Sequence, residues 1–186
     1  MRQLPGGVGQ SQPPAVTEVL SGGRVRLRPV RTDDNAVLTR IFTDPEVARW
    51  WGDPSRAVRD AIEPDASETG FMIEAGSDVI GFIQSVEETD PMYLHAGIDI
   101  AIHSDWQGQG LGPDAIRTLA RYLLSVRGHH RLTIDPAAHN TRAIKAYEKV
   151  GFKPVGIMRK YERGPSGDWH DSLLMDMLAE DLPPQS

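Results

Sequence analysis

The chain has 186 residues, a formal net charge of −6 and no cysteine. This length suits one well-buried domain, because domains typically have about 100 to 150 residues. Without cysteine the chain has no disulfide, no thiolate metal site and no acyl-cysteine intermediate. The acidic balance argues against nucleic acid or an anionic membrane as a partner, since both need clustered Lys and Arg. It accommodates a cationic partner, although mild acidity also simply aids solubility.

Further patterns narrow the class of protein. No apolar run approaches the length of about 18 residues that a membrane helix needs, so we expect no membrane span and a cytoplasmic location. The six histidines are scattered without ligand spacing, so no metal is predicted. Residues 1–22 are rich in glycine, proline and glutamine and are predicted to form a flexible arm. The folded domain is expected over 23–180, followed by a short tail at 181–186.

Strands and helices alternate along the predicted domain. Period-two alternation and bounding turn residues indicate the strands, while helical spacing of apolar residues indicates the helices, with Pro45 and Pro113 at first helical positions. In chain order the predicted elements are strand 24–30, helices 34–42 and 45–51, strands 71–75 and 79–86 joined by a turn, strand 96–102, helix 113–126, a strand through Leu132 and Ile134, helix 140–150, and strands 152–161 and 169–178. This order predicts a mixed α/β sheet.

A glycine-rich turn lies between strand 96–102 and helix 113–126. Its residues are Gln107, Gly108, Gln109, Gly110, Leu111 and Gly112. Unpaired backbone N–H groups and the positive end of the helix can hold a pyrophosphate there, and glycine lets the backbone approach the phosphate closely. A dinucleotide fingerprint would follow the first strand of a βαβ unit, whereas this turn comes late in the chain. A P-loop would end in Gly-Lys-Ser/Thr, and this turn ends in Leu-Gly-Pro instead.

Residues downstream of the turn identify the phosphate ligand. Asn140 precedes a predicted helix, Tyr147 lies near its end, and Gly151 and Phe152 follow. This ordered set resembles the GCN5-related N-acetyltransferase (GNAT) superfamily. The superfamily's pyrophosphate pattern Q/R-x-x-G-x-G/A is met at Gln107, Gly110 and Gly112. The resemblance implies a single-domain α/β GNAT fold, with a mixed, mostly antiparallel central sheet flanked by helices, and acetyl-coenzyme A as co-substrate.

Within that superfamily the chain most closely resembles the aminoglycoside 6'-N-acetyltransferases. The matching segments are ARWWGD at 48–53, IGFIQS at 80–85, AGID at 96–99 and DPAAHNTRAIKAYEKVGF at 135–152. The resemblance implies that the glycine-rich turn, Asn140, Ala143 and Tyr147 bind the cofactor. It also implies a cationic small-molecule amine as partner, no nucleic acid or membrane, and a monomer or homodimer.

Acetyl transfer to an amine needs a neutral amine and a protonated leaving thiolate. An aliphatic ammonium has a pKa of about 10.4, so at neutral pH roughly one molecule in 10³ is reactive without help. Asp99, just before the glycine-rich turn, matches the catalytic Asp of the resembled enzymes and is predicted to be the base. Tyr147 matches the family's proton donor to the thiolate, and the ordinary pKa of a phenol, about 10, suits that transfer.

Each of these residues also has a structural interpretation. In the structural interpretation, Asp99 hydrogen-bonds to backbone or pairs with an arginine, and Tyr147 is a packed aromatic on the apolar face of its helix. Asn140 suits a helix cap. Both of its roles are compatible if its backbone caps the helix while its side-chain amide reaches the pantetheine.

Acidic and aromatic side chains are the candidates for substrate binding. Carboxylates suit a polycation, and Asp135 carries over from the DP context of the resembled enzymes. The full candidate set is Trp50, Trp51, Glu87, Glu88, Asp90, Asp99, Asp135, Asp168 and Asp171. Glu87, Glu88 and Asp90 are expected in a loop beside the cleft, where simple solvation is the competing interpretation. Of the two tryptophans, one is expected to pack in the core.

Four functions follow from these residues. The leading hypothesis is acetyl-coenzyme A-dependent acetylation of the 6'-amine of an aminoglycoside antibiotic by direct attack in a ternary complex, which would confer antibiotic resistance. Two alternatives use the same scaffold: acylation of a metabolite amine, such as an ornithine- or lysine-derived hydroxamate precursor, and acetylation of a protein N-terminus. A fourth is an acyl-coenzyme A sensor without catalysis, against which the presence of both Asp99 and Tyr147 argues.

Overall fold

The computed structural model describes residues 18–164 and 167–184. Within them, eight strands form one sheet in the order β1-β2-β3-β4-β5-β6-β8-β7. Neighbouring strands pair antiparallel, except for β5 and β6, which pair in parallel. The strands are β1 (Leu20–Ser21), β2 (Arg26–Pro29), β3 (Glu68–Ala75), β4 (Asp78–Glu88), β5 (His95–Ile102), β6 (Arg131–Ile134), β7 (Lys153–Arg163) and β8 (Trp169–Leu178).

Two successive helices begin at aspartate caps. The Asp44 carboxylate accepts a hydrogen bond from the backbone N–H of Glu46, and the Asp53 carboxylate accepts one from the N–H of Ser55. Proline follows each of these two caps at the first helical position. The helices are α1 (Asn35–Phe42), α2 (Pro45–Trp51), α3 (Pro54–Ile62), α4 (Leu111–Ser125) and α5 (Thr141–Glu148), with 3₁₀ turns at Thr32–Asp34, Ser104–Trp106 and Ala179–Asp181.

This architecture confirms the predicted mixed, mostly antiparallel α/β sheet and differs from the prediction in three details. Helix α3 was not predicted, although Asp53-Pro54 repeats the cap signal of Asp44-Pro45. Helix α4 begins at Leu111, before Pro113, because Gly110 turns the chain into the helix with a positive φ of 80°. The predicted flexible arm lies mostly outside the described residues, and its last part forms β1, paired with β2.

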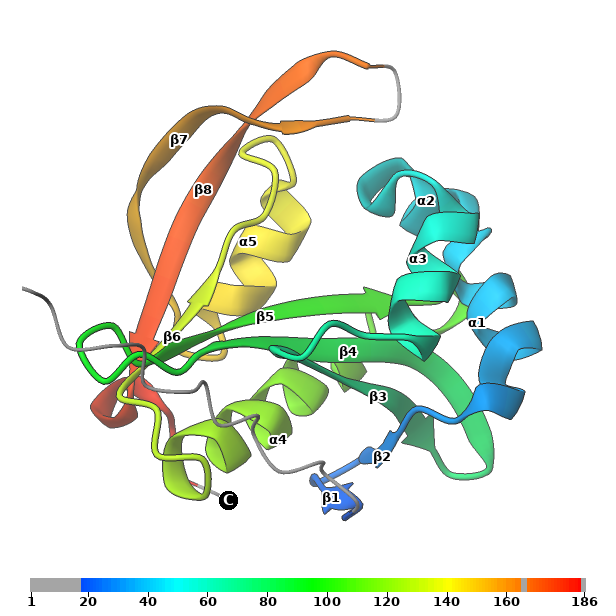
Figure 1. The fold of residues 1–186 in the computed structure, drawn as a ribbon, viewed down its shortest axis with the longest axis horizontal. Coiled ribbons are helices and arrows are strands. Elements are labelled where there is room, and N and C mark those ends of the chain that lie inside the picture. The colour runs from blue at the N-terminus through cyan, green and yellow to red at the C-terminus, as the bar shows by residue number, and fades with distance from the viewer. Residues whose placement is uncertain (1–17, 165–166, 185–186) are drawn as a thin grey trace, which may run out of the picture.

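Helices pack on both faces of the sheet (Figure 1). Helix α4 covers one face, where its buried Ile116 and Leu119 join Ile83 and Ile98 of the sheet in the larger core cluster. Helices α1, α2 and α3 gather on the other face around Phe82 in a second cluster. The β7–β8 hairpin rises on the same side of β5 as α2 (Figure 1). The face opposite α4 is therefore the one on which elements distant in sequence converge.

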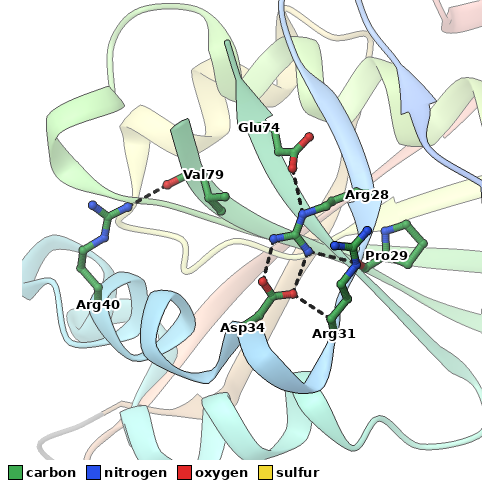
Figure 2. Close-up of polar contacts among 7 residues, drawn as sticks. All are labelled: Arg28, Pro29, Arg31, Asp34, Arg40, Glu74 and Val79. Atoms are coloured by element: carbon green, nitrogen blue, oxygen red, sulfur yellow. Dashed lines mark hydrogen bonds and ion pairs between the residues drawn. The ribbon is translucent and has the colours of Figure 1, made fainter. Parts of the chain in front are cut away.

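An ion-pair cluster fixes the start of the α1–α3 region to the sheet (Figure 2). The Arg28 guanidinium donates to both carboxylate oxygens of Asp34, at 2.6 and 2.7 Å, and to Glu74 Oε1 at 2.8 Å. The backbone N–H of Arg31 donates to Asp34 Oδ2 at 2.7 Å. Burial alone would raise the pKa of Asp34, but the hydrogen bonds from Arg28 and Arg31 lower it below its ordinary value. The cluster thus ties the chain between β2 and α1 to β3.

Candidate active site

The sheet opens where β5 and β6 diverge. These two strands pair only at Ala96–Leu132 and Gly97–Thr133, although β5 continues to Ile102. The edge of β5 beyond Gly97 therefore has no strand partner on the β6 side. A cavity of about 900 Å³ begins at this opening and is lined by α2, the end of β5, the glycine-rich turn, the segment after β6 and α5.

The glycine-rich turn forms one wall of this cavity. Its residues Gln107, Gly108, Gly110 and Gly112 line the space. Gly108 and Gly110 have positive φ angles of 79° and 80°, which a residue with a side chain adopts only at a cost. Among the described residues, no acceptor is hydrogen-bonded to the backbone N–H groups of 108–112. The turn therefore presents free donors at the positive end of α4, as an anionic ligand requires.

The turn is held from two sides. Arg24 donates through Nη1 to the backbone oxygen of Gln109 at 2.5 Å, and the Asp114 carboxylate accepts from the backbone N–H groups of Arg24 and Val25. On the cavity side, the Gln107 side chain donates to the backbone oxygen of Ile102 at 2.7 Å. Of the predicted cofactor residues, Gln109 and Leu111 do not line the cavity; Leu111 is buried in the core instead.

Helix α5 presents basic side chains to the same cavity. Arg142, Lys145 and Lys149 all line it, and Arg142 Nη1 donates to Gln107 Oε1 at 2.8 Å. Sequence reasoning missed this row, although a spacing of three and four residues places such side chains on one helix face. The row adds positive charge beside the glycine-rich turn.

Asn140 caps α5 and lines the cavity. Its side-chain Oδ1 accepts from the backbone N–H of Ala143 at 3.1 Å. The backbone oxygen of Asn140 also accepts from the backbone N–H of Ile144 at 3.1 Å, so the expected backbone cap is present and the side-chain oxygen adds a second one. The amide N–H₂ of Asn140 is the part of the group left for a ligand.

Asp99 lies on β5 inside the cavity, half-buried. The side-chain amide of Gln84 on β4 donates to its Oδ2 at 3.1 Å. Burial, together with the negative charges of Asp135 and Glu68, outweighs this hydrogen bond and raises the pKa of Asp99 to about 6. The carboxylate is thus a stronger base than an ordinary aspartate, as general-base chemistry requires.

Tyr147 lines the cavity from α5 and packs against the core, with its ring centroid 6.4 Å from that of Phe152. Tyr147 is therefore positioned both to contact a ligand in the cavity and to pack against the core. Burial and the negative charges of Asp99 and Asp135 raise the pKa of Tyr147 above its ordinary value of 10.0. The phenol stays protonated at neutral pH and can act as a proton donor.

A bulge in β7 brings further acidic character to the cavity. The register with β8 shifts between Met158 and Glu162, and Lys160 has a positive φ of 50°. Glu162 lines the cavity together with Asp135. Burial and the charge of Asp135 raise the pKa of Glu162, against the opposing effect of two nearby histidines. The charge of Asp135, with burial and a hydrogen bond to that carboxylate, also raises the pKa of Tyr161. Neither Tyr161 nor Glu162 was predicted from the sequence.

The two tryptophans of α2 have different surroundings, as predicted. Trp51 packs on Phe42 and Phe82, with ring centroids 5.0 and 6.0 Å away, and joins the second core cluster. Trp50 instead faces His139 across the cavity, at 5.1 Å between centroids. Both line the cavity, but Trp50 is the one without a core contact of this kind.

Three predicted substrate residues lie elsewhere. Glu87 is not in a loop but near the end of β4, where it is buried and its Oε2 lies 2.6 Å from His129 Nε2 and 3.1 Å from Arg127 Nη2. Burial would raise the pKa of Glu87, but His129 and Arg127 lower it. Glu88 and Asp90 are exposed, and none of the three lines the cavity. The expected position of these residues in a loop beside the cleft is wrong for Glu87 and Glu88, which belong to β4, and the end of β4 leads away from the cavity.

Asp168 and Asp171 also do not line the cavity. The Asp171 carboxylate accepts a hydrogen bond from the backbone N–H of Lys160 at 2.8 Å. It therefore stabilises the β7 bulge. Asp171 therefore supports the shape of the cavity wall and does not contact the cavity itself.

The described part of the chain contains neither a metal site nor a membrane-spanning helix. In 18–164 and 167–184, no three His, Asp or Glu side chains gather as a metal site. Within the same residues, no helix combines the length and apolar character needed to cross a bilayer.

Comparison with known proteins identifies the family. Residues 24–153 match the acetyltransferase (GNAT) domain. The chain is a GNAT family member. It is 28% identical over 159 residues to the aminoglycoside N(6')-acetyltransferase type 1 of Klebsiella pneumoniae, covering 74% of this chain and 78% of that protein. It is 27% identical over 162 residues to the spermidine N(1)-acetyltransferase of Escherichia coli K12, covering 83% and 86%.

A solved structure agrees with the family assignment. The GNAT enzyme AAC(6')-Ib, in complex with paromomycin and acetyl-coenzyme A, superposes with a TM-score of 0.69 at 25% identity, covering 85% of this chain and 95% of that one. This GNAT protein is thus an acetyl-coenzyme A-dependent N-acetyltransferase. Its residues fit the co-substrate: the free N–H groups of the glycine-rich turn and the basic row of α5 suit phosphates, and the unpaired edge of β5 suits an amide-containing arm.

Proposed function

We propose that this enzyme acetylates an amine of a polycationic aminoglycoside, at the 6' position, by direct attack in a ternary complex. The observation that carries the proposal is the shared cavity: the carboxylates of Asp99, Asp135 and Glu162 line the same space as the phosphate-binding turn. Opposite charges at short range favour a cationic acceptor. The Trp50 ring adds an aromatic wall suited to a flat or cyclic ligand.

Asp99 is the base in this proposal. It accepts the proton of the acceptor ammonium, directly or through one water, and its raised pKa of about 6 narrows the gap to the amine. Gln84 fixes the carboxylate through the hydrogen bond to Oδ2. The coenzyme supplies an acetyl thioester as donor. The neutral amine attacks the thioester carbonyl, the C–N bond forms, and the C–S bond breaks.

Tyr147 is the acid. Its pKa is raised by burial and by two carboxylates, so it stays protonated while the thiolate leaves. It donates a proton to the sulfur as the C–S bond breaks, the second proton of the attacking nitrogen passes to the phenolate, and the proton held by Asp99 is the one released to solvent. This assignment uses the family's usual donor position and its placement in the cavity.

A linear polyamine is the second candidate acceptor. The spermidine N(1)-acetyltransferase relative is 27% identical, close to the 28% of the aminoglycoside enzyme. The same three carboxylates would serve a chain of ammonium groups. The aromatic ring of Trp50 favours the aminoglycoside, because a cyclic ligand can stack on this ring whereas a linear polyamine has no ring to stack.

A thiol-release assay separates these candidates. The purified enzyme with acetyl-coenzyme A is supplied with kanamycin-type aminoglycosides, spermidine, a panel of metabolite amines and N-terminal peptides, and products are located by NMR. We expect the highest kcat/KM with an aminoglycoside and acetylation at the 6'-amine. Preference for spermidine or a peptide would refute the proposed acceptor. Tight acetyl-coenzyme A binding without thiol release from any amine would instead favour a sensor.

A further inference from the structure

A second cavity of about 250 Å³ adjoins the first. Arg49, Trp50, Trp51, His139 and Glu162 line both cavities, whereas Gly52, Arg163, Gly164 and His170 line only the second. The second cavity therefore lies on the far side of shared side chains from Asp99 and the glycine-rich turn. A ligand long enough to pass Trp50 and Glu162 would reach it.

Aromatic rings form one boundary of this second cavity. The ring centroids of Trp50 and His139 are 5.1 Å apart, and those of His139 and His170 are 5.4 Å apart. These three residues come from α2, the segment after β6 and β8, so the row spans the opening from one side to the other. Gly164 lies directly against the His170 ring, since any Cβ there would overlap the imidazole. The ring of His170 is thus held in place by backbone.

Glu162 supplies the negative charge. The β7 bulge presents its carboxylate to both cavities, and Asp171 stabilises that bulge through Lys160. Two guanidinium groups also line the second cavity. Arg49 is ion-paired with Glu46 at 3.2 Å and lies 4.7 Å above the Trp50 ring, and Arg163 donates to the backbone oxygen of Gly167 at 2.8 Å. Among the residues that the structure describes, neither guanidinium is ion-paired with Glu162.

We propose that the second cavity binds a further ammonium group of the acceptor, remote from the amine that is acetylated. Glu162 is the counterion, and the aromatic row of Trp50, His139 and His170 bounds the space for the cation. The inference rests on the proposed function, because it assumes a polycationic acceptor in the first cavity. It makes Glu162 a specificity residue that selects polyamines over monoamines.

The test compares two acceptors that differ in the remote amines. One is a kanamycin-type aminoglycoside and the other a 6-amino-6-deoxy monosaccharide, which carries a single amine. With Glu162→Gln we expect kcat/KM for the aminoglycoside to fall about tenfold, mainly through KM, and that for the monoamine to stay unchanged. Glu162→Asp should recover part of the loss. Glu88→Gln, an equal charge change at an exposed residue outside both cavities, should affect neither acceptor.

A direct binding measurement keeps the proposal independent of turnover. In the coenzyme A complex, the imidazole NMR signals of His139 and His170 should shift on adding the aminoglycoside, and this shift should require Glu162. Equal losses of kcat/KM for both acceptors would place Glu162 at the reacting amine or in the fold, and so overturn the proposal.

Failure of the proposed function is distinguishable. If no aminoglycoside is acetylated, the same Glu162→Gln comparison is made between spermidine and butylamine. A selective loss with spermidine would retain the remote-ammonium site with a different acceptor. Equal behaviour of the two amines, with no histidine shift, would refute the site.

Discussion

The substitution Asp99→Asn tests whether the Asp99 carboxylate, which the proposed reaction needs, also lowers the free energy of unfolding. The pKa of Asp99 is about 6 in the folded protein, against an ordinary value of 3.8, because burial and the charges of Asp135 and Glu68 disfavour the carboxylate. A group with a raised pKa stabilises the fold below its unfolded-state pKa and loses that contribution as pH rises through the folded-state value. At about 1.36 kcal/mol per pH unit, the ionised side chain costs about 3 kcal/mol above pH 7.

We therefore expect Asp99→Asn to raise the free energy of unfolding at pH 8 by up to about 3 kcal/mol, with the gain disappearing as the pH falls from 6 to below 4. The asparagine oxygen can still accept from Gln84, so packing is kept. Over the same range, wild-type kcat/KM should rise with pH through about 6, and that of the variant should be lower by about 100-fold or more. Urea unfolding at several pH values and thiol release measure the two effects.

Two results would refute this reasoning. A variant less stable than wild type at pH 8 would show that the carboxylate makes favourable contacts that outweigh its burial. Turnover near that of wild type would remove Asp99 as the base. Unchanged binding of acetyl-coenzyme A, measured by calorimetry, serves as the control that the cavity is intact.

Three further predictions concern neighbouring features. Tyr147→Phe should lower kcat by about 100-fold with little change in the KM for acetyl-coenzyme A, measured by thiol release, since only the proton donor is lost. Gly110→Ala should raise the calorimetric Kd for coenzyme A about tenfold, because its φ of 80° costs alanine about 1 kcal/mol or more and a relaxed turn misplaces its N–H groups. Glu87→Gln should lower the free energy of unfolding by about 3 kcal/mol, through loss of the buried pairs with Arg127 and His129, while leaving KM for the acceptor unchanged in steady-state assays; a raised KM would restore Glu87 as a substrate residue.

Local signals in the sequence located the glycine-rich turn, Asn140 and Asp99, but not the basic row of α5. The glycine-rich turn, the cap at Asn140 and the strand carrying Asp99 each depend on residues close together in the chain, and the structure places them in one cavity. Their backbone conformations follow from residue type, as the positive φ angles of Gly108 and Gly110 show.

The acceptor side could not be predicted in the same way. Glu87 looked like a surface carboxylate, and its partners Arg127 and His129 are 40 and 42 residues away in sequence. Glu162 enters the cavity only because a bulge shifts the register of β7, and a bulge breaks the period-two pattern from which facing is read. Pairings between distant residues and register shifts between strands leave no periodic trace in the sequence, so they became visible only in the fold.

The divergence of β5 from β6 has a consequence for the stability of the sheet. A sheet with two residue pairs between its halves has an internal edge, where backbone amides beyond Gly97 lack strand partners on one side. A ligand arm in that opening would complete the sheet and join the β1–β5 part to the β6–β8 part. The co-substrate would then stabilise the protein in proportion to its concentration over Kd, and slow hydrogen exchange along β5 and β6 as a strand would. Acetyl-coenzyme A would therefore take the place of a strand between β5 and β6 each time it binds.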